Sequence, residues 1–598
     1  MVTCKEWSHT WLNEGFATFC EALYWENYWE RRDKRRRDDE FQYKILQTSD
    51  LYFDEAKNKY KRPIVTNFYK GPEELFDNHS YRKGGSVLHM LRQHVGNQNF
   101  KGALKLYLER HSYKAVETDD LRKVFEEVSG EILQQFFNQW LYRAGHPELE
   151  IEYSLGEKGG KDSKKRELKI KITQVQQEDS NIAFEFPLEV RLILSNDNND
   201  KIPETIQVSQ KVTEHSCSIP KEENIRWISI EPQFKTLNEI KSLNIPEEKE
   251  NFNLKEMLTN QLRGGKTVFE RIQAARILKD RKYLDDDVIS ALQEVVLKHD
   301  NFYAVSVESA YTLGSYNDKS DYSKTDKAYQ ALKNCLDKVA FSRLPPQVRQ
   351  AVVANIGGFE QQEILDRLVE VLQDESYFVE FQAATAIGKC STNLPTSANS
   401  RKTEIIDKLK DLVETTKTFQ NLLAQGAING LKEFSKDKNI DIVNDIAYFL
   451  IEKSEEKNEY YIRSAATSAL GKFLVSKNEE TNQRVFDCLK RLLKDKRQRV
   501  KINACTAFAD SDAKVSEPDA RVIDSINELA WVAGHDLDGF VRRPAEDSLN
   551  IVREWIKDWA EKPQKIDIKM REEAKRRDEA MAIKRKKEDH EKRLELIR

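Results

Sequence analysis

The seven residues Trp11-Leu12-Asn13-Glu14-Gly15-Phe16-Ala17 give the strongest indication of fold and function in this chain of 598 residues. They place a carboxylate directly before a glycine and among large apolar side chains, which predicts Glu14 on a partly buried helix face. A carboxylate in that position is costly unless it is paired or holds a metal ion. Composition alone favours a Glu14 that caps or pairs locally, so a metal-binding role needs further support.

A second informative string is Ser80–Leu91, SYRKGGSVLHML. Ser80 is a candidate helix N-cap, and the apolar residues that follow it have helical spacing. Tyr81 would then stand at the start of a helix, where its hydroxyl can reach into a cleft. The two glycines that follow allow close helix packing. The alternative for Tyr81 is an ordinary surface or packing residue.

The order of four strings resembles the zinc aminopeptidases of the gluzincin class, the alanyl and puromycin-sensitive aminopeptidase family. The strings are WLNEGFA, RPIV (Arg62–Val65), PEELFD (Pro72–Asp77) and SYRKGGSVLHML. The resemblance continues through residues 100–121 and 139–153 and covers about residues 1–240. It implies that residues 1–149 form the C-terminal helical lobe of a thermolysin-like catalytic domain, in which Glu14 and Tyr81 face one exposed cleft.

The resemblance also implies roles for these two residues. In that family one zinc ion is held by the two histidines of an HExxH string and by a glutamate eighteen residues further on, within WLNEG. The HExxH glutamate is the general base, and a tyrosine in a Y-x-KG string donates a hydrogen bond to the oxyanion of the tetrahedral intermediate. Glu14 therefore resembles the third zinc ligand, and Tyr81 resembles the catalytic oxyanion donor.

The chain departs from the family pattern upstream of Glu14. Thirteen residues precede Glu14, so the second zinc histidine would fall before Met1, and no HExxH occurs elsewhere. His9 lies within the spacer and is only a weak candidate ligand. We therefore expect a fragment that begins in mid-motif and is inactive alone, completed by an upstream catalytic half, which could be a separate chain. The alternative is an inactive aminopeptidase-like scaffold that binds partners.

Residues 150–240 change to a period of two. In ELKIKITQV, Leu168, Ile170 and Ile172 alternate with lysines, and FEFPLEVRLIL (184–194) keeps its apolar residues on one parity. This alternation predicts half-buried antiparallel strands, which we interpret as a small β-sandwich. Pro187 is expected at an edge or a bulge, because proline cannot donate to a strand ladder.

Residues 241–562 are predicted to be helical and repetitive. A small residue followed four positions later by a bulky apolar one recurs every 31 to 44 residues, and a basic residue precedes it by three positions in five copies. The small positions are Ala274, Ser309, Val352, Ala383, Ala427, Ala466, Ala504 and Ala545. Periods near 40 residues resemble HEAT-type helical hairpins stacked in a solenoid. A generic helical bundle is the alternative.

The expected fold class is therefore multidomain α+β: the helical lobe, the β-sandwich, the all-α HEAT-like solenoid, and a charged helical tail at 563–598. Lys and Arg number 97 against 101 Asp and Glu, a net charge of −4 that gives no basic field for nucleic acid. No apolar run reaches the roughly 18 residues of a membrane span. Seven scattered cysteines favour a reducing, cytoplasmic compartment. The expected partners are peptide substrates and a protein bound to the solenoid, with neither nucleic acid nor a membrane.

Overall fold

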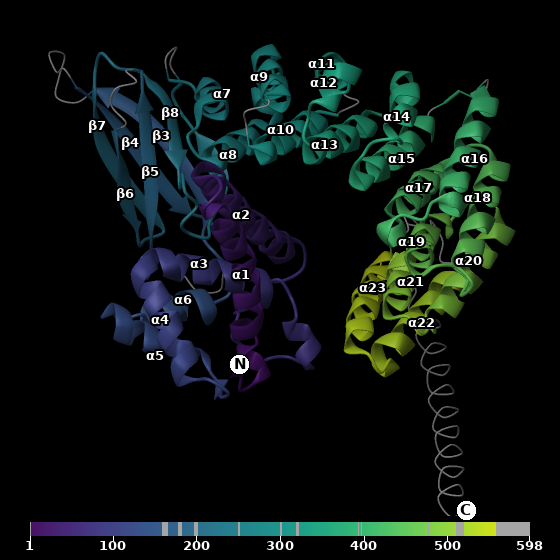
Figure 1. Cartoon of the computed structure of the whole chain (residues 1–598), viewed down its shortest axis with the longest axis horizontal. Helices are drawn as coiled ribbons and strands as arrows, with labels where there is room; N and C mark the ends of the chain where they lie inside the picture. The colour runs from purple at the N-terminus through teal and green to yellow at the C-terminus, as the bar shows by residue number, and fades with distance from the viewer. Residues whose placement is uncertain are drawn as a thin grey trace, which may run out of the picture. The chain divides into compact units, whose positions relative to one another are not determined.

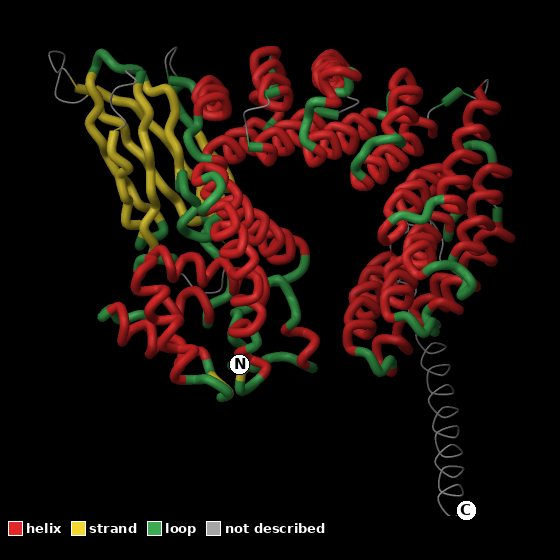
Figure 2. The backbone as a smooth tube through the Cα atoms, viewed as in Figure 1, coloured by secondary structure: helices red, strands yellow, loops and turns green. Residues whose placement is uncertain are grey.

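The chain is mostly helical, and its longer β-strands lie between residues 148 and 244 (Figures 1 and 2). The computed structural model describes residues 2–557 apart from 158–164, 177–181, 196–200, 249–251, 299–301, 318–321, 393, 396–397, 477 and 510–519. The predicted charged tail at 563–598 lies outside the described residues. The chain divides into two compact units, Met1–Phe359 and Glu360–Arg598, and each is described by itself.

The first unit opens with a helical lobe built around a long helix pair. The helices are α1 (Trp11–Glu30), α2 (Lys34–Asn58), α3 (Gly84–Val95), α4 (Asn97–Arg110), α5 (Thr118–Ser129) and α6 (Gln134–Leu141), and α3 is preceded by a short π-helix, η3 (His79–Lys83). Phe100 is the centre of the lobe's core, with its ring edge-on to Phe19 and Phe125 at centroid distances of 5.7 and 5.4 Å. A short parallel pair, β1 (Thr3–Cys4) with β2 (Ala115–Val116), ties the start of the chain to the beginning of α5.

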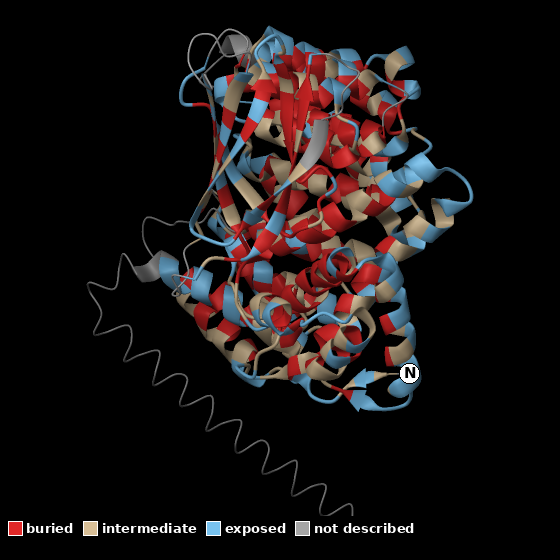
Figure 3. Ribbon diagram, turned by 90° about the vertical axis from the view of Figure 1, so that its left-hand side faces the viewer, coloured by how far each residue is buried: buried red, intermediate tan, exposed pale blue. Residues whose placement is uncertain are grey.

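The β region forms two sheets. The strands are β3 (Glu148–Glu157), β4 (Lys165–Gln174), β5 (Phe186–Leu194), β6 (Lys201–Val208), β7 (Val212–Pro220), β8 (Ile225–Ile230) and β9 (Glu239–Asn244). The four-stranded sheet has the order β7-β4-β3-β9 and the three-stranded sheet the order β6-β5-β8. Leu168, Ile170 and Ile172 of β4 are buried, as their alternation predicts. Figure 3 shows both buried (red) and exposed (pale blue) segments along the strands. On β5 the alternation is incomplete, because Glu189 is also buried.

Pro187 lies in β5, the middle strand of its sheet, rather than in an edge strand. At this position, however, β5 is paired with a neighbouring strand on one side only. Pro187 is opposite Gln207 of β6, whereas the pairing with β8 begins at Val190. The proline therefore removes no ladder hydrogen bond, since its nitrogen side has no neighbouring strand to bond.

Seven α-helices follow the strands among the described residues of the first unit. They are α7 (Leu254–Gly264), α8 (Val268–Leu278), α9 (Asp286–Leu297), α10 (Tyr303–Ser315), α11 (Tyr322–Cys335), α12 (Lys338–Ser342) and α13 (Pro346–Ile356). Helix α8 packs on α10, and α10 packs on α13. Arg276 of α8 reaches back to the lobe, where its Nη1 and Nη2 donate to the two carboxylate oxygens of Asp50 on α2, each at 2.8 Å.

The second unit is helical in all its described elements. They include α14 (Leu365–Val371), α15 (Tyr377–Thr392), α16 (Asn399–Thr415), α17 (Leu422–Lys432), α18 (Ile440–Lys453), α19 (Tyr460–Leu470), α20 (Glu479–Leu492), α21 (Gln498–Ala509), α22 (Ala520–His535) and α23 (Gly539–Lys557). Helices α15, α17, α19, α21 and α23 pack in that order, each on the next. Ion pairs join helices of this unit to loops 35 residues further on, as in Lys402 of α16 with Asp437 at 2.8 Å and Lys501 of α21 with Asp536 at 2.7 Å.

The eight small residues picked out by spacing all lie in helices and are fully buried. The basic residue three positions earlier has a role that its spacing did not reveal. Arg349, Arg463 and Arg542 each donate to a backbone carbonyl in the turn before their own helix, at 2.8, 3.3 and 2.9 Å. Assignment of these helices to the HEAT type stays a prediction. Within the described ranges, no helix combines the length and apolar character needed to cross a bilayer.

Candidate active site

Glu14 lies in the first turn of α1 and is half-buried. Trp11 and Phe19 on the same helix are 1% exposed and hold α1 in the core of the lobe. Trp11 also donates its indole N–H to the Thr118 hydroxyl at 2.9 Å, which fixes the start of α1 against α5. The Glu14 carboxylate therefore lies at the start of α1, which is held both by core packing and by the hydrogen bond from Trp11 to Thr118.

Tyr81 lies in the π-helix η3 rather than in the first turn of an α-helix. The backbone N–H of Lys83 donates to the carbonyl of Asn78 at 2.9 Å, a five-residue bond that widens the turn. Ser80 is therefore not the N-cap that we predicted, and α3 begins only at Gly84. A π-turn of this kind is frequent at functional sites, because the extra residue redirects a side chain.

Glycines bring the two elements together. A Cβ on Gly15 would lie 3.0 Å from the carbonyl carbon of Gly84, and a Cβ on Gly85 would lie 2.9 Å from Cγ2 of Thr18. Any larger side chain at these positions would separate α1 from η3 and α3. Since Gly15 follows Glu14 directly and Gly84 is three residues after Tyr81, this backbone contact sets the distance between the two predicted site residues.

The Glu14 carboxylate and the Tyr81 hydroxyl lie close enough to interact electrostatically. Burial raises the pKa of the Tyr81 hydroxyl to about 12, and the nearby Glu14 carboxylate adds to the rise. Tyr81 consequently keeps its proton at neutral pH and can act as a hydrogen-bond donor. The exposed cleft expected for the pair, and the roles of ligand and oxyanion donor, stay predictions.

Aromatic rings flank the pair on one side. The ring of Phe76 lies 6.4 Å from that of Tyr81 and 5.9 Å from that of Trp7. Trp7 is 48% exposed, an unusual state for such a large apolar side chain. The candidate site therefore has an apolar wall next to its two polar groups.

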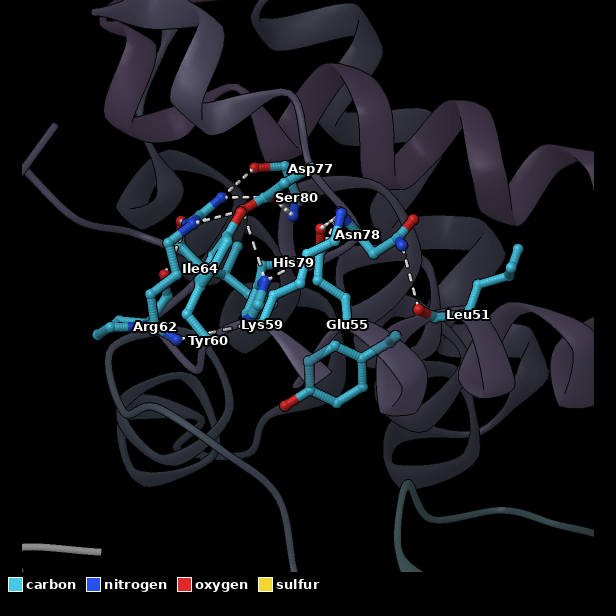
Figure 4. A network of polar contacts seen from close by, with 12 residues as sticks. Leu51, Glu55, Lys59, Tyr60, Arg62, Ile64, Asp77, Asn78, His79 and Ser80 are labelled. Atoms are coloured by element: carbon cyan, nitrogen blue, oxygen red, sulfur yellow. Dashed lines mark hydrogen bonds and ion pairs between the residues drawn. The ribbon is translucent and has the colours of Figure 1, made fainter. Parts of the chain in front are cut away.

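A buried polar network supports the π-turn from behind (Figure 4). The Asp77 carboxylate accepts from Nε and Nη2 of Arg62 at 2.8 and 2.5 Å and from the Tyr60 hydroxyl at 2.9 Å. Burial alone would raise the pKa of Asp77, but the nearby His79 imidazole and the hydrogen bonds and charge of Arg62 hold that pKa well below its usual range. Both Arg62 and Asp77 lie within the strings quoted above, but spacing gave no sign that they pair.

The other histidines close to the predicted site are engaged elsewhere. His9 contacts the Thr118 hydroxyl through Nδ1 at 2.9 Å, and burial lowers its pKa. Burial likewise lowers the pKa of His89 to about 4, and its Nε2 is 3.0 Å from the Phe234 carbonyl. His94 lies 3.1 Å from Glu131. No direct contact of these three histidines with Glu14 is seen in the described part of the chain.

Two groups of potential metal ligands occur among the described residues, and neither includes Glu14. They are Glu55 with Asp77 and His79, and His146 with Glu148 and Glu239. Glu14 offers one carboxylate, whereas a catalytic zinc needs three protein ligands. The described residues therefore do not complete a zinc site around Glu14 by themselves.

Comparison with known proteins places this site in a family context. Residues 1–140 match the Peptidase family M1 domain, and that segment contains both Glu14 and Tyr81. Aminopeptidase M1-C of Oryza sativa subsp. japonica is 32% identical over 152 residues, which are 25% of this chain and 17% of that protein. Aminopeptidase M1 of Arabidopsis thaliana is 31% identical over 154 residues, 25% of this chain and 16% of that protein. The match thus spans about a sixth of the length of these curated relatives.

The fold as a whole also has a solved counterpart. Aminopeptidase A of Legionella pneumophila, crystallised in complex with aspartic acid, superposes with a TM-score of 0.58 at 16% identity. The superposition covers 92% of this chain and 64% of that one. At this identity the likeness concerns the fold alone, so the peptidase resemblance of the sequence is carried by residues 1–140.

Proposed function

We propose that the helical lobe supplies the Glu14–Tyr81 part of a zinc aminopeptidase active site, which releases N-terminal amino acids from peptides. The observation that carries the proposal is the close backbone contact of Gly15 with Gly84, which brings Glu14 near Tyr81 although the two lie 67 positions apart in the chain and in separate elements. The match of residues 1–140 to the Peptidase family M1 domain supports it.

In this proposal Glu14 is one ligand of the zinc ion, and an HExxH segment outside residues 1–598 supplies the two histidines and the general base. A zinc ion held in this way would provide Lewis acidity and an activated water. Tyr81 remains protonated at neutral pH and donates a hydrogen bond to the oxyanion that develops on the scissile carbonyl. The wall of Phe76 and Trp7 would shield the reacting groups from water.

A non-catalytic scaffold is the second candidate. It is supported by the series of packed helices from α15 to α23 in the second unit. In this case the helices between Leu254 and Lys557 would bind a protein partner. A cytoplasmic location is proposed for both candidates, supported by seven cysteines that are all free.

The test measures zinc content and aminoacyl-anilide hydrolysis on the chain alone and on the chain completed by an HExxH segment, either fused ahead of Met1 or added as a separate polypeptide. We expect zinc-dependent hydrolysis only in the completed form. There Glu14→Ala should remove the metal, while Tyr81→Phe should retain zinc and lower turnover by roughly 10²–10³-fold.

Two neighbouring residues provide matched controls. Glu21 lies on the same helix with a 66% exposed side chain, and Tyr24 is 60% exposed. Glu21→Ala and Tyr24→Phe should leave both zinc and turnover unchanged. Turnover by the chain alone would contradict the proposal, and a completed form that binds zinc without hydrolysis would favour the scaffold.

A further inference from the structure

His79 is held in one orientation inside the lobe, two residues before Tyr81. Its side chain is fully buried. The ring stacks on Tyr60 at a centroid distance of 5.2 Å and an interplanar angle of 9°, and it lies edge-on to Tyr52 at 5.3 Å and 86°. Figure 4 shows the imidazole in the middle of the network that surrounds the start of the π-turn.

The position of the imidazole proton follows from one hydrogen bond. The backbone N–H of Arg62 donates to Nε2 of His79 at 3.3 Å. A backbone N–H can only donate, so Nε2 must present its lone pair. The proton of the ring then sits on Nδ1, on the opposite side from Arg62.

Nδ1 faces two carboxylates at equal distance. It lies 3.4 Å from Oε2 of Glu55 and 3.4 Å from Oδ2 of Asp77. Both distances are longer than an ordinary hydrogen bond, and Nδ1 has no partner of hydrogen-bond geometry among the described residues. The N–H of Nδ1 therefore acts on the two carboxylates through its partial positive charge. The side chains of Glu55 and Asp77 are 6% and 0% exposed, so a donor between them offsets part of the cost of burying two like charges.

The same two carboxylates cap the start of the π-turn. Glu55 Oε2 accepts from the backbone N–H of Asn78 at 2.7 Å, and Asp77 Oδ1 accepts from that of Ser80 at 3.0 Å. Free N–H groups at the start of a helical turn need such acceptors. His79 therefore links the two anchors that fix the turn carrying Tyr81.

A metal ion in place of the proton is the alternative, because Glu55, Asp77 and His79 could each offer a ligand atom. Metal binding would need the lone pair on Nδ1 and would move the proton to Nε2, against the N–H of Arg62. In addition, the Arg62 guanidinium already occupies the Asp77 carboxylate. The donor pattern thus favours a proton at Nδ1.

We propose that His79 is a positioning residue for Tyr81: its Nδ1–H, fixed by the backbone of Arg62, joins Glu55 to Asp77 and so holds the π-turn that presents Tyr81 to Glu14. The catalytic consequence rests on the proposed function, whereas the placement of Tyr81 does not. Loss of the Nδ1–H should separate the two carboxylate anchors and release Tyr81 from Glu14.

The first test uses the full chain labelled with 3-fluorotyrosine, in which Tyr81→Phe identifies the fluorine NMR signal of Tyr81. Glu14→Gln should shift this signal in the wild-type background, because the two side chains lie close enough to interact electrostatically. In the His79→Leu background the same change should leave the signal unmoved. His79→Asn should restore the response, since its Nδ2–H takes the place of Nδ1–H, whereas His79→Gln reaches past that position and should not.

His146→Leu is the matched control. His146 is 1% exposed and contacts the hydroxyl of the same Tyr52 at 3.1 Å, but it lies outside the π-turn. This variant should be destabilised and still respond to Glu14→Gln. A response retained in both His79→Leu and His79→Gln, or lost equally in His146→Leu, would overturn the proposal. If the leucine variant does not fold, the comparison of His79→Asn with His79→Gln decides.

The second test uses the completed enzyme. His79→Gln should lower kcat by up to roughly 10²-fold, the effect of a misplacement of about 1 Å, with KM and zinc content little changed. His79→Asn should recover most of the loss. If the wild-type chain completed by an HExxH segment has no activity, the proposed function is contradicted. The response of the Tyr81 fluorine signal still tests whether His79 positions Tyr81, so failure of the proposed function and failure of the positioning role are distinguishable.

Discussion

Two glycine contacts, one in each compact unit, bring helices to the same close approach with different results. In the first unit Gly15 of α1 meets Gly84, and a Cβ on Gly15 would lie 3.0 Å from the Gly84 carbonyl carbon. In the second unit Gly388 of α15 meets Gly430 of α17, where a Cβ on Gly388 would overlap the Gly430 backbone. Both contacts join backbone to backbone, which only glycine allows.

The surroundings of the two contacts differ. Glu14 and Tyr81 flank the first, and a buried polar network lies behind it. Fully buried small residues such as Ala383 and Ala427 flank the second, which is one step in a series of packed helices. The comparison indicates that the first contact positions polar groups and the second sets a helix spacing. Substitutions at the first glycine contact should then affect the geometry of the Glu14–Tyr81 site, and substitutions at the second contact should affect stability alone.

The largest effect is expected from Asp77→Ala, which breaks the polar support of the first unit. Removal of one partner from a buried ion pair leaves Arg62 uncompensated and costs about 3–5 kcal/mol. Thermal melts of the full chain should show a large drop in the midpoint of the first unit. The matched control is Asp366→Ala, whose partner is Arg401 and whose side chain is 91% exposed, with an expected cost of about 0–1 kcal/mol. Equal losses in both variants would contradict this account.

The same aspartate predicts a dependence on acid. Because the pKa of Asp77 is depressed in the folded chain, its contribution to stability is complete above the unfolded value of about 3.9. The contribution is lost as the pH falls from that value towards the lower pKa of the folded state. Melts recorded at successively lower pH should therefore converge for wild type and Asp77→Ala. A gap between them that stays constant down to the lowest pH would argue against the depressed pKa.

Replacing Gly15 or Gly388 with alanine compares the effect of the two glycine contacts on stability and on site geometry. Gly388→Ala forces a Cβ into backbone and should cost about 3 kcal/mol, at the upper end for overpacking, and Gly15→Ala should cost closer to 1 kcal/mol. Only Gly15→Ala should abolish the response of the Tyr81 fluorine signal to Glu14→Gln. If Gly388→Ala also changed that response, the division between positioning and spacing would be wrong.

Leucine substitutions at the repeated small residues test whether helix packing in the second unit affects stability. Ala466 and Ala504 are fully buried in α19 and α21, which pack on each other. Ala466→Leu and Ala504→Leu should each cost about 1–3 kcal/mol through overpacking. Thermal melts of the full chain measure the loss, and an unchanged midpoint would count against the repeat register.

The smallest effect is a gain. Gly102 lies within α4, and a Cβ there would meet only Cγ1 of Val128 at 3.4 Å, an ordinary contact. Gly102→Ala should therefore stabilise the chain by about 0.5–1 kcal/mol through helix propensity. A loss of stability in melts of this variant would show that α4 has less room than the structure indicates.

Regular features of the sequence predicted the repeated parts of the fold well. The alternation around Ile170 placed buried residues on one face of β4, and the spacing of Ala466 and its counterparts picked out buried helix positions. These patterns depend on local periodicity, which a sequence displays directly. The expectation that Glu14 and Tyr81 face one cleft came from family resemblance alone, because no periodicity links the two residues.

The parts that escaped prediction depend on irregular backbone and on pairing between segments. Ser80 was assigned as an N-cap because a π-turn has no distinctive sequence signal. Arg62 and Asp77 pair through the path of the intervening loop, and nothing in their spacing indicates it. The division of the helices after Phe359 was also invisible, because the repeat pattern runs through it.

The bridge from Arg276 to Asp50 has a consequence for the order in which the chain matures. The two residues are 226 positions apart, whereas the helix-to-loop ion pairs of the second unit are about 35 positions apart. At a synthesis rate of about 5–20 residues per second, Arg276 emerges from the ribosome roughly 10–45 s after Asp50. The lobe that carries Glu14 and Tyr81 is thus synthesised before the helix that completes its contacts, and during that interval its unpaired surface is accessible to chaperones.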